Sequence, residues 1–442
     1  MKKITSLLVL LILVMSLGLT ACNNSSKEKE SENGDDVTTS NETDKDKEKP
    51  VKIRVAYYAA GEAADTMAKI VDEFMKDNPG IEVETIQSNW GGHYERLKAE
   101  LAAGAAPEVF LLDGVYIPQY AERGVLEDLT DRASSLDEEK YLGIKQLRNP
   151  EGRLYGIPQG IQVDVLYYNK DMFDEASVEY PTDEWTLDDL KEAAIKLTNE
   201  EHYGFAIPSN QLRYGWYPII RQFGGDILDE TRTQSTIASD PKVREAMEFI
   251  YDAWNTDKYV PEFDAMAGEL TNKSHTYFPR KKVAMFYDAF VGTTRCNEAG
   301  INYDVVIQPK QEERYASFIA NSWVLNSDIG EEEKEAGWKF MEYYLSEKAQ
   351  KLHATVANSL PSNKAVMEEM LSDTTTVPAN KKAFLDTFEF AATLAENAVW
   401  SEQNKVFQAD LEKYLGDTIS LDEFIELADK DVQKVLDDFY KK

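Results

Sequence analysis

The chain is poor in cysteine and histidine, and positive charge is in deficit. Its 442 residues include two cysteines, Cys22 and Cys296, too few for a disulfide framework. The four histidines lie far apart, without the spacing of a metal site. Lys and Arg number 48 against 80 Asp and Glu, a net charge of −32. A surface of that charge repels phosphate polymers, so we expect no nucleic-acid partner.

Motifs of common catalytic and nucleotide-binding sites are also missing. No Gly-x-Gly-x-x-Gly follows the first predicted strand, and no Gly-Lys-Ser/Thr phosphate loop occurs. Neither Gly-x-Ser-x-Gly nor Ser-x-x-Lys marks a nucleophile. Carboxylate pairs suited to glycoside hydrolysis carry no information in a chain with 80 acids. The sequence therefore implies no catalytic cofactor and favours a protein that is not an enzyme.

The first residues have the pattern of a bacterial signal peptide. Two lysines precede an apolar run over residues 6–19 that is too short to span a membrane comfortably. Leu19-Thr20-Ala21-Cys22 then resembles a lipobox, although an ordinary signal peptide with a coincidental cysteine is the alternative. Residues 23–49 hold no aromatic and one aliphatic residue, Val37, too little to form a core. We expect a signal peptide over 1–21, a lipid on Cys22, and a flexible tether through residue 49.

The remainder alternates between strand and helix patterns. Residues 52–57, 81–85 and 109–112 are predicted strands, separated by helices whose apolar residues recur at helical spacing. Strand–helix–strand succession implies a parallel sheet with right-handed crossovers. Because ligands of such sheets gather at the carboxyl ends of the strands, Tyr57, Tyr58, Trp90 and Asp113 are candidate binding residues.

Further elements are predicted along the rest of the chain. Strands are expected at 163–168, 204–207, 283–287 and 322–325. Helices are expected at 187–197, from 241 with Trp254 on its apolar face, at 331–345, and over most of the tail. Thr186 to Asp189 is a near capping box, and Ser420 with Glu423 is a full one.

From about residue 51 the chain resembles the family 1 extracellular solute-binding proteins, the maltose-binding-protein-like carbohydrate receptors of ABC importers. The resemblance rests on the order and spacing of short stretches over roughly 390 residues. They include Pro107-Glu-Val-Phe-Leu-Leu-Asp113, Gly152-Arg-Leu-Tyr-Gly-Ile-Pro158, Leu166-Tyr-Tyr-Asn-Lys-Asp171, Phe223-Gly-Gly-Asp226 and Ala336-Gly-Trp-Lys-Phe340. A lipobox and tether are typical of Gram-positive members, which would place this protein at the outer face of the cytoplasmic membrane.

The resemblance implies an α/β fold of two lobes, the type II periplasmic-binding-protein arrangement, with the ligand between them. Lobe I would comprise residues 50–163 plus 316–368, and lobe II residues 164–315 plus 369–442. Crossings between the lobes are expected near 162–165, 313–318 and 367–378. The implied partners are a carbohydrate, bound by a monomer through hinge closure, and the permease subunits that receive it.

The resemblance also adds candidates for the sugar site, where aromatic rings match sugar faces and carboxylates match hydroxyls. Tyr214 or Trp216 would offer a ring from lobe II, whereas Trp400 would either stack on sugar or lie in a helix core. Phe290 and Asp288 stand where the family commonly has the Trp and Gly of Gly-Ser-Trp. Asp113 could instead cap a helix, and Asp164 could instead form a hinge salt bridge. The full candidate set is Tyr58, Trp90, Asp113, Asp164, Tyr214, Trp216, Asp288, Phe290, Trp323 and Trp400.

The sequence leaves the ligand open. A receptor of the same fold for a peptide, polyamine, metal or glycerol phosphodiester is one alternative; a surface adhesin and a secreted glycan-acting enzyme are others. Arg213, Arg280 and Arg295 could meet the carboxylates of an acidic glycan, or could be exposed or ion-paired arginines. Trp185, Trp254 and Trp338 sit in helical patterns and are predicted to be core residues.

Overall fold

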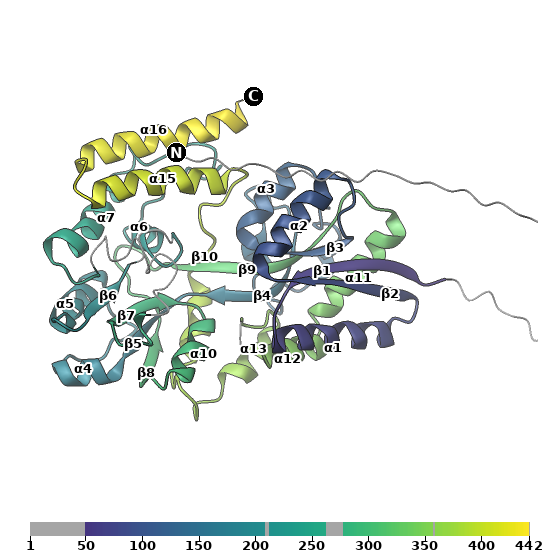
Figure 1. Ribbon diagram of the computed structural model, residues 1–442, viewed down its shortest axis with the longest axis horizontal. Coiled ribbons are helices and arrows are strands. Elements are labelled where there is room, and N and C mark those ends of the chain that lie inside the picture. The colour runs from purple at the N-terminus through teal and green to yellow at the C-terminus, as the bar shows by residue number, and fades with distance from the viewer. Residues whose placement is uncertain (1–48, 208–211, 262–276, 357–358, 442) are drawn as a thin grey trace, which may run out of the picture. The chain divides into compact units, whose positions relative to one another are not determined.

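The computed structural model describes residues 49–207, 212–261, 277–356 and 359–441. Residues 49–442 form one compact unit. The predicted signal peptide, Cys22 and nearly all of the predicted tether lie outside the described residues. Two sheets organise this unit (Figure 1). The larger holds β1 (Val51–Tyr58), β2 (Ile81–Ser88), β3 (Val109–Asp113), β4 (Ile157–Val163), β9 (Ala316–Leu325) and β10 (Ala391–Ala392); the smaller holds β5 (Val165–Asn169), β6 (Tyr203–Ala206), β7 (Val283–Asp288) and β8 (Tyr303–Val306).

The first sheet confirms the predicted parallel arrangement for its first three strands. β1 pairs in parallel with β2 and with β3, so Tyr58 and Asp113 end neighbouring strands at the same edge. β9 runs antiparallel to both β3 and β4, which makes the sheet mixed rather than parallel throughout. In Figure 1, α1 lies on one side of this sheet and α2 and α3 on the other. Its helices are α1 (Glu62–Asp77), α2 (Trp90–Ala102), α3 (Ile117–Glu122), α11 (Glu331–Tyr344) and α12 (Glu347–Ala354).

The second sheet has the order β6-β7-β5-β8, with β6 parallel to β7 and β5 antiparallel to both its neighbours. Helices from three stretches of the chain pack around it, and Figure 1 shows α15 and α16 lying side by side. These helices are α4 (Lys170–Ala176), α5 (Leu187–Leu197), α6 (Trp216–Gln222), α7 (Pro241–Tyr251), α10 (Val291–Glu298), α15 (Trp400–Leu415) and α16 (Leu421–Tyr440). The predicted capping boxes at Thr186 and Ser420 are both formed.

Two sequence predictions need correction. The strand predicted over 163–168 is interrupted at Asp164: β4 ends one residue before it, and β5 begins one residue after it in the other sheet. The helix predicted from 241 ends as α7 at Tyr251, and Trp254 lies in the π-helical turn Asp252–Thr256 that follows. Trp254 is nevertheless buried, as are Trp338 and most of Trp185, so all three are core residues as predicted.

One hydrophobic cluster spans both sheets. It joins Val163 of β4, Val165 of β5 and Phe318 of β9 to residues of α13 (Lys364–Leu371) and α14 (Lys382–Asp386). The chain passes between the sheets at Asp164 and again between β8 and β9. The Asp164 amide donates a hydrogen bond to the Ser317 carbonyl oxygen, 3.3 Å away, which ties the two passages together.

Candidate functional site

Four aromatic side chains gather at the carboxyl edge of the first sheet. Tyr94 lies at their centre, with ring centroids 6.2 Å from Tyr58, 4.9 Å from Trp90 and 5.0 Å from Tyr116. Trp90 opens α2 directly after Asn89, whose side chain caps the helix by accepting from the Gly92 amide. We call these four residues (Tyr58, Trp90, Tyr94 and Tyr116) the aromatic wall. Trp90 is 51% exposed, so one large ring is left open to a ligand.

Asp113, the last residue of β3, lies against the aromatic wall. Its amide donates a 2.8 Å hydrogen bond to the Tyr94 hydroxyl. Its Oδ1 atom is buried and has no hydrogen-bond partner among the described residues. Burial raises the pKa of the Asp113 carboxyl, and the charge of Arg213 opposes that rise. A buried carboxylate oxygen without a donor is costly to the protein alone, and it is a ready acceptor for a ligand hydroxyl.

Arg213 and Asp164 form a buried ion pair where the chain crosses between the sheets. Arg213 Nε lies 2.9 Å from Asp164 Oδ2, and Nη2 lies 2.5 Å from Oδ1. Nη1 donates to Gln162 Oε1 at 3.1 Å, and the guanidinium carbon lies 4.8 Å from the centroid of the Tyr214 ring. The Asp164 side chain is fully buried. Of the two roles open to Asp164, the structure thus shows the salt bridge.

Asp288, from the second sheet, lies close enough to Arg213 and Asp164 to interact with their charges. It ends β7, accepts a 2.8 Å hydrogen bond from the Ala289 amide and pairs with Arg295 at 3.2 Å. Burial raises the pKa of Asp288 to about 6, against the charge of Arg295. Phe290 follows closely but packs inward, with its ring centroid 5.1 Å from that of Phe384.

Arg213 is electrostatically coupled to four acids. Burial raises the pKa of Asp113, Asp164, Asp288 and Glu396, and in each case the charge of Arg213 acts in the opposite direction. We call these five residues the Arg213 cluster. Its acids come from both sheets, from the crossing between them and from the segment before α15. The fold therefore concentrates ionisable and hydroxyl-binding groups at the junction of the sheets.

A cavity of about 660 Å³ adjoins Glu396. One side is formed by residues within 114–124 and 146–155, and the other by residues 230–233, 393, 396–398 and Tyr440. Burial raises the pKa of Glu396 to about 8, opposed by Arg232 and reinforced by Asp113. The volume lies within the range of small-molecule sites, roughly 300–1,000 Å³.

The structure brings some of the predicted residues together and separates others. Asp113, Asp164, Tyr214 and Asp288 interact through Arg213, and Tyr58 and Trp90 join them through Asp113 and Tyr94. Trp216 is 1% exposed and stacks on Phe407 at 4.2 Å in the core beside the second sheet. The remaining predicted aromatics, Phe290, Trp323 and Trp400, are buried as well.

Sequence reasoning passed over Gln162, Tyr94, Tyr116 and Glu396 as site residues. Tyr116 could have been found, because it lies three residues after Asp113 on the same connection. Gln162 is the first residue of the crossing predicted over 162–165, and its amide was a visible signal. Nothing in the local pattern marks Glu396, which becomes part of the site only through the fold. Within the described ranges, no group of three His, Cys, Asp or Glu side chains is arranged to hold a metal ion.

Two sheets linked by crossing segments, with aromatic, carboxylate and guanidinium groups at their junction, define an α/β binding protein. The chain belongs to the bacterial extracellular solute-binding proteins: the match to this family covers residues 60–351. Members of the family bind their solutes outside the cytoplasmic membrane. In the part of the chain that the structure describes, we find no helix of the length and apolarity needed to cross a bilayer.

Individual relatives are distant in sequence. A Brucella abortus protein named only as a binding protein is 24% identical over 325 residues, covering 71% of this chain and 76% of the relative. The galactooligosaccharide-binding protein of Bacillus subtilis is 23% identical over 266 residues, covering 58% of this chain and 61% of the relative. An ABC substrate-binding protein of Listeria monocytogenes, solved in complex with cycloalternan, superposes with a TM-score of 0.75 at 25% identity, covering 88% and 99% of the two chains.

Proposed function

We propose that this protein captures a carbohydrate, an oligosaccharide rather than a single sugar, and delivers it to the permease of an ABC importer. The observation that carries the proposal is the buried Oδ1 atom of Asp113, which has no donor among the described residues and belongs to the acid of the Arg213 cluster that contacts the aromatic wall. A sugar would offer hydroxyl donors to the Asp113 carboxylate and C–H faces to the exposed ring of Trp90. The names of the Bacillus and Listeria relatives support a sugar as the ligand.

We expect the protein to close around its ligand, because the candidate binding residues come from both sheets. Asp113 belongs to the first sheet and Asp288 to the second, so a ligand that contacts both favours the arrangement in which they are close. We propose lobe boundaries at 163/164, 315/316 and 368/369, with Asp164 at the first crossing. The protein would bind its sugar without transforming it, as a monomer, since the proposed role needs neither a nucleophile nor a second subunit.

The proposal includes a membrane anchor. Cleavage before Cys22 and lipidation of its thiol would hold the protein at the outer face of the cytoplasmic membrane of a Gram-positive cell. The predicted tether up to residue 49 would then let the binding unit reach the permease. Metabolic labelling with a palmitate analogue tests this part: label should enter the wild type and not Cys22→Ser, whereas equal labelling would contradict it.

A thermal-shift panel tests the ligand class. The panel holds malto-, galacto- and chito-oligosaccharides beside peptides, polyamines, amino acids and glycerol phosphodiesters. A ligand present at 100 times its Kd stabilises the folded state by about 2.7 kcal/mol, which is readily detected. We expect a shift with one class of oligosaccharide. A flat response to all sugars with a shift for another solute would overturn the carbohydrate assignment and leave the family unchanged.

A further inference from the structure

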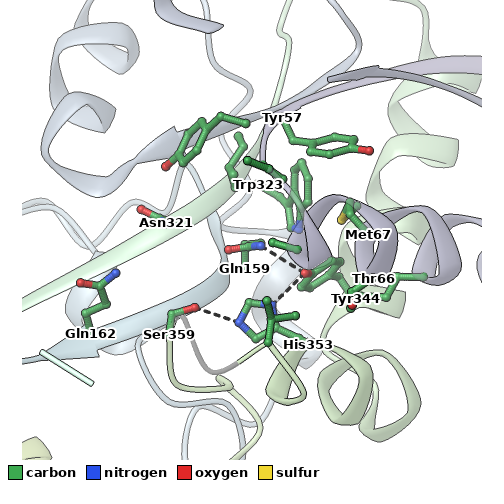
Figure 2. A pocket seen from close by; sticks show the side chains of 17 residues that line it. Tyr57, Thr66, Met67, Gln159, Gln162, Asn321, Trp323, Tyr344, His353 and Ser359 are labelled. Atoms are coloured by element: carbon green, nitrogen blue, oxygen red, sulfur yellow. Dashed lines mark hydrogen bonds between the residues drawn. The ribbon is translucent and has the colours of Figure 1, made fainter. Parts of the chain in front are cut away.

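A second cavity, of about 320 Å³, lies inside the part of the chain built on the first sheet. The buried face of α1 lines it with Thr66, Met67 and Ile70, and the sheet contributes Leu111 and Trp323. Figure 2 shows the remaining polar side chains around it, among them Gln159, Asn321 and Ser359. We call this space the α1 pocket.

The α1 pocket combines apolar side chains with several polar ones and carries no ionised group. Its lining has no Asp, Glu, Lys or Arg, although 29% of the chain is charged. Its one histidine, His353, is buried, and burial lowers the pKa of this imidazole to about 4, which leaves it neutral at physiological pH. A charged ligand would therefore find no counter-ion here, whereas a neutral polar ligand would find hydrogen-bonding partners.

One side of the α1 pocket is a continuous chain of hydrogen bonds, drawn as dashed lines in Figure 2. Gln159 Nε2 donates to the Tyr344 hydroxyl at 3.2 Å, this hydroxyl lies 3.1 Å from His353 Nδ1, and His353 Nε2 lies 2.9 Å from Ser359 Oγ. A neutral imidazole has one donor and one acceptor nitrogen, so each link in the chain can be satisfied. The chain fixes the positions of these side chains before any ligand arrives.

Trp323, unlike the residues of this hydrogen-bonded chain, has a polar atom without a partner in the described part of the protein. Its side chain is fully buried, it lines the α1 pocket, and its Nε1 atom has no hydrogen-bond partner among the described residues. Buried N–H groups in proteins are almost always paired. An acceptor inside the α1 pocket, such as a ligand hydroxyl, would complete the set.

The α1 pocket shares residues with the candidate sugar site. Tyr58 belongs both to the pocket lining and to the aromatic wall, where it is also coupled to Asp113. Gln162 lines the pocket and accepts from Arg213 Nη1. Tyr58 and Gln162 therefore connect the lining of the α1 pocket to the Arg213 cluster.

We infer that the α1 pocket is an additional subsite that takes one neutral sugar unit at the end of a bound oligosaccharide. The inference rests on the proposed carbohydrate function and extends it to the ligand's length and charge. The Trp323 indole N–H would donate to a hydroxyl of that unit, with Asn321 and Ser359 nearby on the lining. The volume is at the low end for ligand sites, enough for one small group rather than a whole oligosaccharide.

Calorimetric titration with malto- and β-1,4-galacto-oligosaccharides of two to five units tests the inference. In the wild type, one added unit should raise affinity about tenfold, or about 1.4 kcal/mol. Ala63→Leu puts a larger side chain on the half-buried lining of the α1 pocket and should abolish that step without changing the Kd of shorter sugars. Ala64→Leu is the matched control, since it is equally half-buried on α1 and does not line the pocket.

Other outcomes of the titration would overturn the inference in distinguishable ways. An unchanged length dependence in Ala63→Leu would show that the pocket holds only water and would overturn the inference while leaving the sugar site intact. Failure of the wild type to bind any sugar would overturn the proposed function and the inference with it. If Ala63→Leu does not fold, Ala59→Leu in the loop after β1 enlarges another lining residue and gives the same readout.

Discussion

Arg213 and Asp164 are joined by two parallel hydrogen bonds, at 2.9 and 2.5 Å, at the point where the chain first crosses between its two sheets. The Asp164 carboxylate is fully buried and the Arg213 side chain is 11% exposed. Because both charges have left water, such a pair contributes to stability only when its hydrogen-bond geometry is good. Arg213 also contacts Gln162 and Tyr214, so the crossing and the candidate site share one guanidinium.

Removing Arg213 should destabilise the protein strongly. Arg213→Ala leaves the Asp164 carboxylate buried and unpaired, and we expect a loss of about 3–5 kcal/mol in the free energy of unfolding, measured by urea denaturation. The control Arg132→Ala breaks exposed pairs with Glu331 and Glu335 and should cost less than about 1 kcal/mol. The double variant Arg213→Met with Asp164→Leu should recover part of the loss. Equal effects of Arg213→Ala and Arg132→Ala would argue against a structural ion pair.

Trp90 and Trp216 should respond in opposite ways to truncation. Trp90→Ala removes an exposed ring, so the melting temperature should hardly change while sugar affinity falls about tenfold. Trp216→Ala removes a buried ring stacked on Phe407 and should cost about 3–5 kcal/mol in stability. Melting curves and calorimetry on both variants check this. A large drop in stability for Trp90→Ala would show that it is a packing residue and not part of a ligand wall.

Glu396 should make the stability of the ligand-free protein depend on pH. Its pKa is raised by burial from 4.5 to about 8, so folding favours the protonated form. Its contribution is therefore full below about pH 4.5 and is lost as the pH rises through 8. Glu396→Gln should remove this loss, so that the variant gains on the wild type by up to a few kcal/mol between pH 5 and 8.5.

Chemical denaturation across that pH range measures the Glu396 effect. Glu389→Gln is the control, because Glu389 is exposed a few residues away on the same segment. Parallel pH profiles for wild type and Glu396→Gln would rule out a buried, neutral Glu396.

The sequence predicted the elements better than the site. Apolar periodicity and capping signals located β1, β2, α1 and both capping boxes, because a local pattern decides them. The local pattern did not show the break at Asp164, since apolar residues on both sides look like one strand until Arg213, 49 residues later, is placed beside it. Only the family resemblance placed a crossing near 162–165. Asp113 was found as a candidate because the carboxyl edge of a parallel sheet is set by topology, whereas Asp164 and Asp288 came from the family resemblance.

The tryptophans show why the rest was not predictable. An aromatic ring suits a sugar face and a hydrophobic core equally well, and only packing distinguishes them. Trp216 lies two residues from Tyr214, yet the α6 turn directs it into the core against Phe407. Trp323 belongs to β9 of the first sheet, and its buried side chain lines the α1 pocket rather than an exposed surface.

Titration of an Asp113 variant is the most direct test of the account. The sugar that gives the largest thermal shift would be titrated into wild type, Asp113→Asn and the control Asp72→Asn, which changes an exposed carboxylate on α1. We predict that Asp113→Asn weakens binding by about tenfold to a hundredfold, about 1.4–2.8 kcal/mol, without lowering the melting temperature, and that Asp72→Asn binds like wild type. Unchanged affinity in Asp113→Asn would contradict the claim that the unpartnered Oδ1 atom of Asp113 is the acceptor that holds the sugar.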